Sequence, residues 1–353
     1  MNAFGSGIEH AVVSAVPGAL EAARAIDGHI RVEYPDDFPP LAGKPWPGRL
    51  WRLAQAMKPF DLILTYNWGA MDAVLSHSAF RDYLRLPPLV HHEDGFNEDE
   101  SGGLKRSRNW YRQVALARSS ALVVPSRQLE AIAHESWNQP HGKVKLIVNG
   151  IDTAAYRRKP NANALPRVVK RKGELWLGTL AGLRQVKDLP RLVRAFSGLP
   201  EPWQLVILGE GPERDAIRAE AMRLNLSHRV HLPGFVSDPA TAIGLFDLFA
   251  LSSRSEQFPI SVVEAMAAGL PIASPDVGDV AAMVSDENLP FVTPAEDEKA
   301  LGDALASLAA DAKLRRKIGR ANRALAEAEY DEGRMIGAYR LLYGSVLGSG
   351  AFP

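Results

Sequence analysis

The sequence predicts an α/β protein with two doubly wound domains, each a parallel sheet covered by helices on both faces. The first observation is that strand-like apolar runs alternate with helix-like segments along most of the chain, which indicates parallel sheets. The second is that a basic, proline-containing stretch at residues 154–172 interrupts this alternation, which then restarts. The third is length, because 353 residues are enough for two ordinary domains with separate cores.

The first domain is expected to span residues 1–153. A glycine-rich turn at residues 4–10 is expected to lead into a helix that ends near residue 26. Such a turn normally follows a strand, and only three residues precede it, so the expected first strand is missing or a stub. The following strands are predicted at 29–34, 60–66, 88–92, 121–125 and 144–148, alternating with helices at 48–57, 69–79, 104–118 and 126–136.

Residues 154–172 are interpreted as a linker, residues 173–329 as the second domain, and residues 330–353 as a C-terminal helical segment. Strands of the second domain are predicted at 175–180, 204–208, 229–232, 247–252, 271–274 and 289–292. Its helices are predicted at 187–198, 212–224, 239–245, 259–269, 279–285, 296–309 and 311–328. A last helix at 330–347 carries apolar and aromatic side chains on one face.

Two glutamates separated by seven residues, Glu256 and Glu264, bracket the start of the helix at 259–269. Pro259 suits a helix N-terminus, and Gly269 suits a helix end. A helix N-terminus attracts phosphate, and carboxylates accept hydrogen bonds from sugar hydroxyls. The alternative is structural, because Ser261 and Glu264 have the spacing of a capping box.

Arg184 and Lys187 follow the first strand of the second domain and precede a helix. Ligands of open α/β sheets bind beyond the carboxyl ends of the strands. Arginine can hold a diphosphate with two hydrogen bonds, and lysine supplies a mobile point charge. The alternative interpretation is a solvated basic turn.

The stretch from Glu256 to Glu264 resembles the E-x7-E motif of retaining GT-B glycosyltransferases, of the family 4-like group 1 type. The resemblance spans nearly the whole chain and includes the turn at Asn149 and Gly150, similar to the family's interdomain junction. It implies two Rossmann-like domains facing each other across a cleft, with the acceptor on the N-terminal side and the donor on the C-terminal side. It also implies a C-terminal helix that crosses back to the first domain. The chain departs from the pattern at the missing first strand and at Gln257, where glycine is common.

The resemblance implies a catalytic role for Glu256 at the sugar hydroxyls and for Arg184 and Lys187 at the diphosphate, with Glu264 at the ribose. It also places a histidine near the transferred sugar. His92 is favoured over His91, and the alternatives for this pair are loop packing or metal binding. The other residues expected at the donor are Gly182, Gly209, Gly234, Phe235, Phe258, Pro259, Ile260, Ser261 and Val262. The turn with Gly5 and Gly7 is expected to approach the donor phosphate or the acceptor.

The implied activity is transfer of a hexose-like unit, with retention of configuration, from a nucleoside diphosphate sugar to a saccharide or lipid-linked acceptor. The implied setting is the synthesis of cell-surface polysaccharide or glycolipid. Two alternatives stay open: an epimerase that acts on the nucleotide sugar, and a non-catalytic scaffold that binds it. We expect no cofactor beyond the nucleotide sugar and no metal, because Arg184, Lys187 and a helix N-terminus already supply positive charge. No Asp-x-Asp pair lies among these donor-side loops.

Charge and composition limit the classes of partner and the cellular compartment that we expect. Basic and acidic residues both number 41, so no net field favours nucleic acid. The chain has no cysteine and no apolar run of about 20 residues, and we expect a cytoplasmic protein. Helix 104–118 is either a solvated basic face or a surface that contacts anionic lipid at the inner face of the membrane. Its cations and aromatic residues are Lys105, Arg106, Arg108, Arg112, Arg118, Trp110 and Tyr111.

Overall fold

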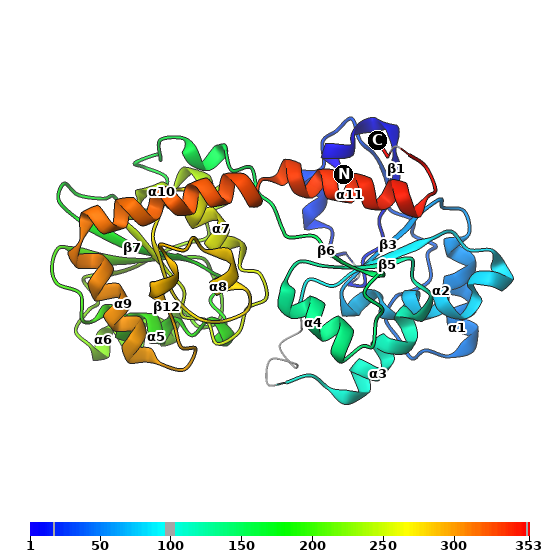
Figure 1. Cartoon of the computed structure of the whole chain (residues 1–353), viewed down its shortest axis with the longest axis horizontal. Helices are drawn as coiled ribbons and strands as arrows, with labels where there is room; N and C mark the ends of the chain where they lie inside the picture. The colour runs from blue at the N-terminus through cyan, green and yellow to red at the C-terminus, as the bar shows by residue number, and fades with distance from the viewer. Residues whose placement is uncertain (17, 96–102, 351) are drawn as a thin grey trace. The chain divides into compact units, whose positions relative to one another are not determined.

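The chain forms two compact units, and each is described by itself. The computed structural model describes residues 1–16, 18–95, 103–350 and 352–353. The first unit combines Met1–Val148 with Ile336–Pro353, and the second is Asn149–Met335 (Figure 1). The sequence between the strand expected at 88–92 and the helix expected at 104–118 is rich in acidic residues, and most of it lies outside the described residues.

The first unit contains a four-stranded parallel sheet in the order β3-β4-β5-β6. Its strands are β3 (Ile63–Tyr66), β4 (Leu89–His92), β5 (Ala121–Val124) and β6 (Val144–Leu146). The helices between them are α1 (Pro47–Met57), α2 (Met71–Leu84), α3 (Arg106–Ala115) and α4 (Arg127–Glu135). Every residue of β4 and β5 is buried, as expected for parallel strands covered on both faces.

The N-terminal segment differs from the prediction. Instead of a helix reaching residue 26, it forms the 3-10 turn η1 (Asn2–Gly7), strand β1 (Glu9–Ala11) and a second 3-10 turn, η2 (Glu21–Ala25). Strand β1 pairs in parallel with β2 (Arg31–Glu33), and the two form a sheet separate from the four-stranded one. The glycine-rich turn therefore precedes a strand and does not follow one. Local chemistry explains the error, because Val12 and Val13 are β-branched and Gly18 has a φ of +77°.

The turn that carries Gly5 and Gly7 packs against the C-terminal segment of the same unit. The Phe4 ring lies 5.3 Å from that of Phe352. An Nη2 atom of Arg340 donates a 2.7 Å hydrogen bond to the carbonyl of Ala3. A Cβ added at Gly7 would lie 3.7 Å from the Cβ of Pro353. The turn is thus held by helix α11 (Glu332–Val346) and the residues that follow it.

The second unit has a six-stranded parallel sheet in the order β12-β11-β10-β7-β8-β9. Its strands are β7 (Leu175–Leu180), β8 (Trp203–Leu208), β9 (Val230–Gly234), β10 (Leu248–Ala250), β11 (Ile272–Pro275) and β12 (Val292–Thr293). Its longer helices are α5 (Leu189–Phe196), α6 (Arg214–Arg223), α7 (Ile260–Ala267), α9 (Glu298–Ala310) and α10 (Ala312–Glu329), with α8 (Val280–Met283) a single turn. The strand order reverses between β7 and β10, and such a switch point is where ligands of open sheets bind.

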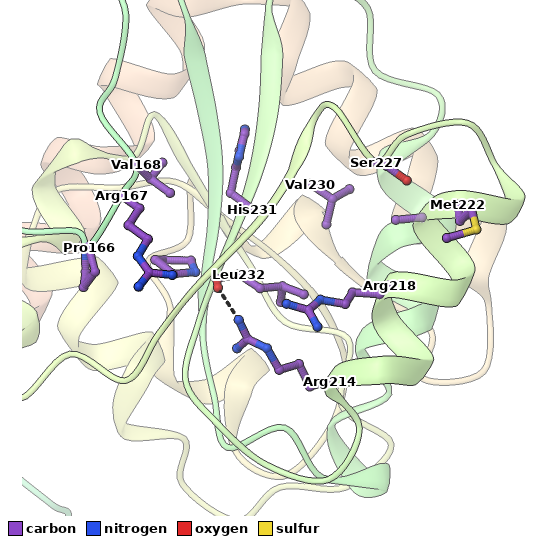
Figure 2. Close-up of a pocket in the computed structure, with 12 residues that line it drawn as sticks. Pro166, Arg167, Val168, Arg214, Arg218, Met222, Ser227, Val230, His231 and Leu232 are labelled. Atoms are coloured by element: carbon purple, nitrogen blue, oxygen red, sulfur yellow. Dashed lines mark hydrogen bonds between the residues drawn. The ribbon is translucent and has the colours of Figure 1, made fainter.

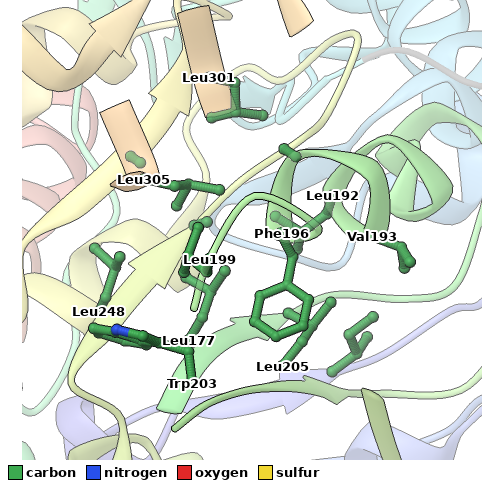
Figure 3. Packing of buried hydrophobic residues seen from close by; sticks show 14 of the residues in the cluster. Leu177, Leu192, Val193, Phe196, Leu199, Trp203, Leu205, Leu248, Leu301 and Leu305 are labelled. Carbon is green, nitrogen blue, oxygen red and sulfur yellow. The ribbon is translucent and has the colours of Figure 1, made fainter. Parts of the chain in front are cut away.

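One face of this sheet carries a large apolar core (Figure 3). Leu177 and Leu205 of the sheet pack with Phe196 of α5 and with Leu301 and Leu305 of α9. All five side chains are fully buried. Burial of a large side chain of this kind typically contributes about 1.5–3 kcal/mol. This core therefore stabilises the sheet that carries the loops at the switch point.

The stretch interpreted as a linker packs against the second unit. Tyr156 and Leu165 are buried. The amide of Asn161 donates to the carbonyl of Thr241 at 2.8 Å, and Nζ of Lys170 donates to the carbonyl of Leu245 at 2.7 Å. These residues are therefore part of the second unit and not a free connection.

Candidate functional site

Helix α7 begins where the sequence predicts, but without the capping box that was the structural alternative for Ser261 and Glu264. Pro259 takes the N-cap position, which has no side-chain cap. Ser261 lies inside the helix, and Glu264 lies one turn further on. At the other end the amide of Gly269 donates to Met266 O at 2.8 Å and that of Leu270 to Ala265 O at 3.0 Å. This is a Schellman motif, and Gly269 supports it with a φ of +77°.

Glu264 is buried and bound to a tyrosine that the sequence interpretation missed. The hydroxyl of Tyr156 donates to Oε1 of Glu264 at 2.7 Å. Burial raises the pKa of Glu264, and the hydrogen bond from Tyr156 opposes that shift by favouring the carboxylate. The pKa of Tyr156 is raised by burial and by the neighbouring carboxylate. No local motif identifies this pair, because the two residues lie 108 positions apart.

Glu256 and Lys187 form a direct ion pair, with Nζ and Oε1 2.5 Å apart. The same carboxylate oxygen accepts a 2.6 Å hydrogen bond from Oγ of Ser253. Only 18% of the lysine side chain and 9% of the glutamate side chain are exposed, so water screens their attraction less than at an open surface. The pair brings the loop after β7 and the loop before α7 to one place.

Backbone contacts hold these two loops together. Oγ of Ser252 donates to the carbonyl oxygen of Lys187 at 2.9 Å. The amide of Arg254 donates to the carbonyl oxygen of Val186, also at 2.9 Å. Gly278 packs against the same loop, because a Cβ there would lie 2.6 Å from Gln257 O and 2.7 Å from Glu256 O. Sequence reasoning missed Ser253 and Gly278, which position Glu256 through its side chain and its backbone.

Arg184 lies at the same loop and is exposed. Among the ion pairs of the described residues, none involves its guanidinium. It precedes a 3-10 turn, η7 (Gln185–Lys187), and α5 begins only after Asp188. Lys187 therefore lies in this turn and not in the first turn of the helix.

Glycine at position 209 allows the loop after β8 to approach the loop of Gly182. Gly209 has a φ of +136°, and a Cβ there would lie 1.9 Å from the carbonyl oxygen of Ala181. Its amide donates to the carbonyl of Gly234 at 2.9 Å. This glycine is required for close loop packing, whatever ligand the loops hold.

The remaining expected donor residues divide into buried and exposed groups. Phe258 and Val262 are buried, and the Phe258 ring packs edge-on against Tyr330 with centroids 5.6 Å apart. These two could offer a ligand only their backbone. Phe235 and Ile260 are exposed, with Phe235 following the end of β9 at Gly234.

The histidine pair at the end of β4 is buried. His92 Nδ1 lies 3.2 Å from the carbonyl of Thr65, and Nε2 lies 2.9 Å from the hydroxyl of Tyr343. Since a carbonyl only accepts, Nδ1 carries the proton and Nε2 accepts from Tyr343. Burial lowers the pKa of His92 to about 4. These contacts match the loop-packing alternative for His92 and leave neither ring nitrogen free for a sugar.

His91 also has a partner inside the first unit, because its Nδ1 lies 2.9 Å from Oγ1 of Thr65. Its Nε2 lies 3.5 Å from the carboxylate of Glu93. In the parts of the chain that the structure describes, no group of three or more His, Asp or Glu side chains is arranged to hold a metal ion.

Helix α3 does not present all of its cations on one face, as a simple basic surface would require. Arg112 is buried, with its guanidinium 4.9 Å from the Trp68 ring and 5.0 Å from the Trp137 ring. Trp110 is 64% exposed, and Arg106 and Val114 are exposed on the same side of the helix. No helix within the described ranges is long and apolar enough to cross a membrane.

Two family models together match most of the chain. Residues 162–325 match the model described as glycosyl transferases group 1, and residues 5–155 match that of glycosyltransferase family 4. The N-acetyl-alpha-D-glucosaminyl L-malate synthase of Bacillus anthracis is 24% identical over 64% of this chain and 61% of its own length. The phosphatidyl-myo-inositol mannosyltransferase of Mycobacterium leprae is 28% identical over 69% of this chain and 63% of its own length. The chain thus spans about three fifths of the length of these relatives.

Solved structures show the same fold. The complex of Anabaena Alr3699/HepE with UDP and glucose has a TM-score of 0.74 at 20% identity, covering 95% of this chain and 98% of that one. The sucrose-phosphate synthase from Thermosynechococcus elongatus has a TM-score of 0.72 at 22% identity, covering 91% and 85%. At this level of identity the likeness concerns the arrangement of the elements.

Proposed function

The chain belongs to the group 1 glycosyltransferases with a family 4 N-terminal half and has the GT-B fold, and from this we propose its reaction. It moves a hexose-like unit from a nucleoside diphosphate sugar to a saccharide or lipid-linked acceptor, with retention of configuration. Support for this donor class comes from a protein of similar fold, Anabaena HepE, whose structure holds UDP and glucose. The proposed setting is cell-surface polysaccharide or glycolipid synthesis in the cytoplasm.

The contact between Lys187 and Glu256 is the observation that carries this proposal. It joins a cation suited to a leaving diphosphate with a carboxylate suited to the hydroxyls of the sugar. As the bond between sugar and diphosphate breaks, positive charge grows on the sugar ring and negative charge on the diphosphate. Glu256 would stabilise the first and Lys187 the second, and such fixed groups at a site of developing charge lower the barrier.

Arg184 and the start of α7 complete the phosphate side in this proposal. Arg184 is exposed and can turn its planar guanidinium toward two phosphate oxygens at once. The first amides of α7 have no acceptor within the helix, as in any α-helix. That of Val262 donates to the carbonyl of Pro259 at 3.0 Å, so those of Ile260 and Ser261 are proposed to attract the negative charge. These groups would neutralise the leaving diphosphate without a metal or another cofactor.

Glu264 is proposed to accept hydrogen bonds from the ribose hydroxyls. One of its oxygens is held by Tyr156, and a carboxylate has further lone pairs for other donors. Hydroxyl donors stabilise the ionised form of a buried carboxyl group. Ribose binding and Tyr156 would therefore both favour the carboxylate form of Glu264.

Two alternatives predict different products. An epimerase would change the nucleotide sugar when no acceptor is present. A scaffold would bind the nucleotide sugar and leave it intact whatever acceptor is supplied. A partly buried carboxylate paired with a lysine favours catalysis over a scaffold, because simple binding has no need of it beside the sugar.

The test is a two-step experiment on the full chain. Thermal-shift screening against nucleoside diphosphates and their sugars identifies the donor, and turnover with candidate acceptors is then measured, with the product anomer assigned by NMR. Glu256→Gln should lower the rate by about 10²–10³-fold, the usual effect of losing one group that stabilises developing charge. Its affinity for the nucleoside diphosphate should hold or rise, because Lys187 is no longer neutralised.

Glu296→Gln, which alters an exposed carboxylate of the same unit, is the matched control and should retain full turnover. Unchanged turnover in Glu256→Gln would refute the assignment. Epimerised donor without acceptor, or binding without any turnover, would select one of the two alternatives.

A membrane contact of the first unit is proposed for the exposed side of α3. Trp110, with Arg106 and Val114 beside it, offers an aromatic ring and a cation to an anionic lipid surface. Co-sedimentation with phosphatidylglycerol vesicles should fall in Trp110→Ala. Equal sedimentation of both proteins would leave α3 as a solvated face.

A further inference from the structure

A pocket of about 690 Å³ lies beside strand β9, at the edge of the sheet in the second unit (Figure 2). Residues 166–168, one side of α6 and residues 230–233 of β9 line it. None of the four residues proposed to act on the donor, Arg184, Lys187, Glu256 and Glu264, is part of its lining. Its volume falls in the range typical of sites for small molecules, and nothing in the proposed transfer reaction uses it.

Three arginines line this pocket and make it positively charged. The guanidinium groups of Arg167, Arg214 and Arg218 come from two different segments and approach the region of Leu232 (Figure 2). No aspartate or glutamate is among the lining residues. Arg218 has a carboxylate nearby, that of Asp215, but at 3.7 Å and with the aspartate side chain 94% exposed. A surface pair of this kind is worth little, so the positive charge is largely uncompensated.

The geometry argues against an added β-strand as the occupant, although β9 is an edge strand. Arg214 already donates a 2.7 Å hydrogen bond from Nη2 to the carbonyl of Leu232. Pro233, the next residue, has no amide hydrogen to offer a partner strand. A peptide strand added at this edge could hydrogen bond neither to the carbonyl of Leu232 nor to an amide of Pro233. An anion needs neither of these backbone groups.

The segment that supplies Arg167 is fixed and not a loose tail. Arg167 has a φ of +60°, in the left-handed region that non-glycine residues seldom occupy. The preceding Leu165 is 3% exposed and anchors the segment in the second unit. The backbone that carries Arg167 is therefore part of the packed second unit, so only the exposed side chain has to be ordered when a ligand binds.

We propose that this pocket binds a small organic anion at a site separate from the donor. Its phosphoryl or carboxylate group lies among Arg167, Arg214 and Arg218, since guanidinium groups hold such oxyanions with paired hydrogen bonds. The rest of the molecule lies against the apolar surface of Val168, Met222 and Leu232. The lining residues include no Phe, Tyr or Trp, and the imidazole of His231 is already hydrogen bonded to Oε1 of Gln204 at 3.0 Å, which favours a phosphorylated or acidic sugar over a nucleotide.

Calorimetric titration of the full chain tests the proposal with three probes: a hexose 6-phosphate, the same hexose without phosphate, and inorganic phosphate. The pocket variant is the double substitution Arg167→Gln and Arg218→Gln, because both side chains are exposed and their loss should not disturb folding. The control is Arg223→Gln, which removes an exposed arginine of the same helix outside the pocket.

The hexose phosphate should bind the unaltered chain, and the pocket variant should bind it at least about tenfold more weakly, as expected for lost charge-assisted hydrogen bonds. Arg223→Gln should bind within about twofold of the unaltered chain, and the neutral hexose should not bind. Tighter binding of the hexose phosphate than of inorganic phosphate supports a sugar-sized ligand. Equal binding of the two would contradict an organic ligand, because the sugar would then add nothing to the contact of phosphate with the three arginines.

Three outcomes would overturn the proposal. The first is no measurable binding of any anion at about 10 mM, well above the concentrations at which specific sites fill. The second is an equal loss in Arg223→Gln and in the pocket variant, which would indicate a general effect of charge. The third is displacement of the anion by saturating nucleoside diphosphate, which would place it in the donor site.

Discussion

The hydroxyl of Tyr156 donates a 2.7 Å hydrogen bond to Oε1 of Glu264, and both residues are buried. Tyr156 belongs to the segment that begins the second unit. Glu264 is the second carboxylate of the E-x7-E motif and lies on α7. The contact therefore fixes the carboxylate proposed to bind the ribose from a part of the chain outside the motif.

Tyr156→Phe should destabilise the second unit by about 1–3 kcal/mol, because it leaves a buried carboxylate without its donor. It should also weaken nucleoside binding, since Glu264 loses the group that holds it in place. Urea denaturation measures the first effect, and calorimetry with the nucleoside measures the second.

Tyr330→Phe is the control for this prediction. Its hydroxyl donates to the carbonyl of Met283 at 3.1 Å and is also buried. The control should lose stability but keep nucleoside affinity. Equal nucleoside affinity in both variants would limit Tyr156 to a structural role.

Arg184→Ala and Lys187→Ala should weaken the binding of a nucleoside diphosphate far more than that of the bare nucleoside. A hydrogen bond to a charged group is typically worth about 1.5–3 kcal/mol, which corresponds to more than a tenfold change in affinity. Calorimetry with the two ligands separates the diphosphate contribution from that of the nucleoside.

Arg254→Ala provides a comparison on the neighbouring loop, because this exposed guanidinium is already paired with Asp188 at 2.8 Å. It should change affinity for the diphosphate little. If Arg184→Ala and Lys187→Ala weakened both ligands equally, the diphosphate assignment would be wrong.

Exhaustive chelation should leave turnover nearly unchanged once the donor and acceptor are identified. The reason is that Arg184, Lys187 and the start of α7 would supply the positive charge that a metal supplies in other transferases. The measurement compares rates before and after treatment with EDTA. A loss that magnesium or manganese restores would contradict the mechanism and return His91, His92, Glu93 and Asp94 to consideration as ligands.

Acid should destabilise the first unit through His92. Its pKa in the folded chain is about 4, below the ordinary value of 6.5, so the unfolded chain binds more protons between these two values. Stability therefore falls as pH decreases from 6.5 to 4, by roughly 3 kcal/mol from this residue. Denaturation measured across this range should show a shallower pH dependence in His92→Gln.

His29→Gln, an exposed histidine of the same unit, should keep the pH dependence of the unaltered chain. Parallel stability curves for His92→Gln and the unaltered chain would mean that His92 is not the group responsible.

The sequence by itself determined the repeating arrangement and the position of the motif helix. Strand-like runs alternating with helical periods specify parallel sheets, because both patterns arise from residues close together in the chain. The prediction of a helix starting near Pro259 and ending at Gly269 rested on the same local rules. Where those rules conflicted, in the glycine-rich N-terminal turn, the expected helix was wrong and a short strand formed.

The tertiary structure decided which side chains meet. Lys187 contacts Glu256 across 69 positions, Tyr156 contacts Glu264 across 108, and His92 contacts Tyr343 across 251. Spacing along the chain carries no information about such pairs, since they depend on how separate elements pack on the sheet. The arginines beside β9 were likewise ordinary cations in the sequence, and only the tertiary structure placed residue 167 and α6 at the same pocket.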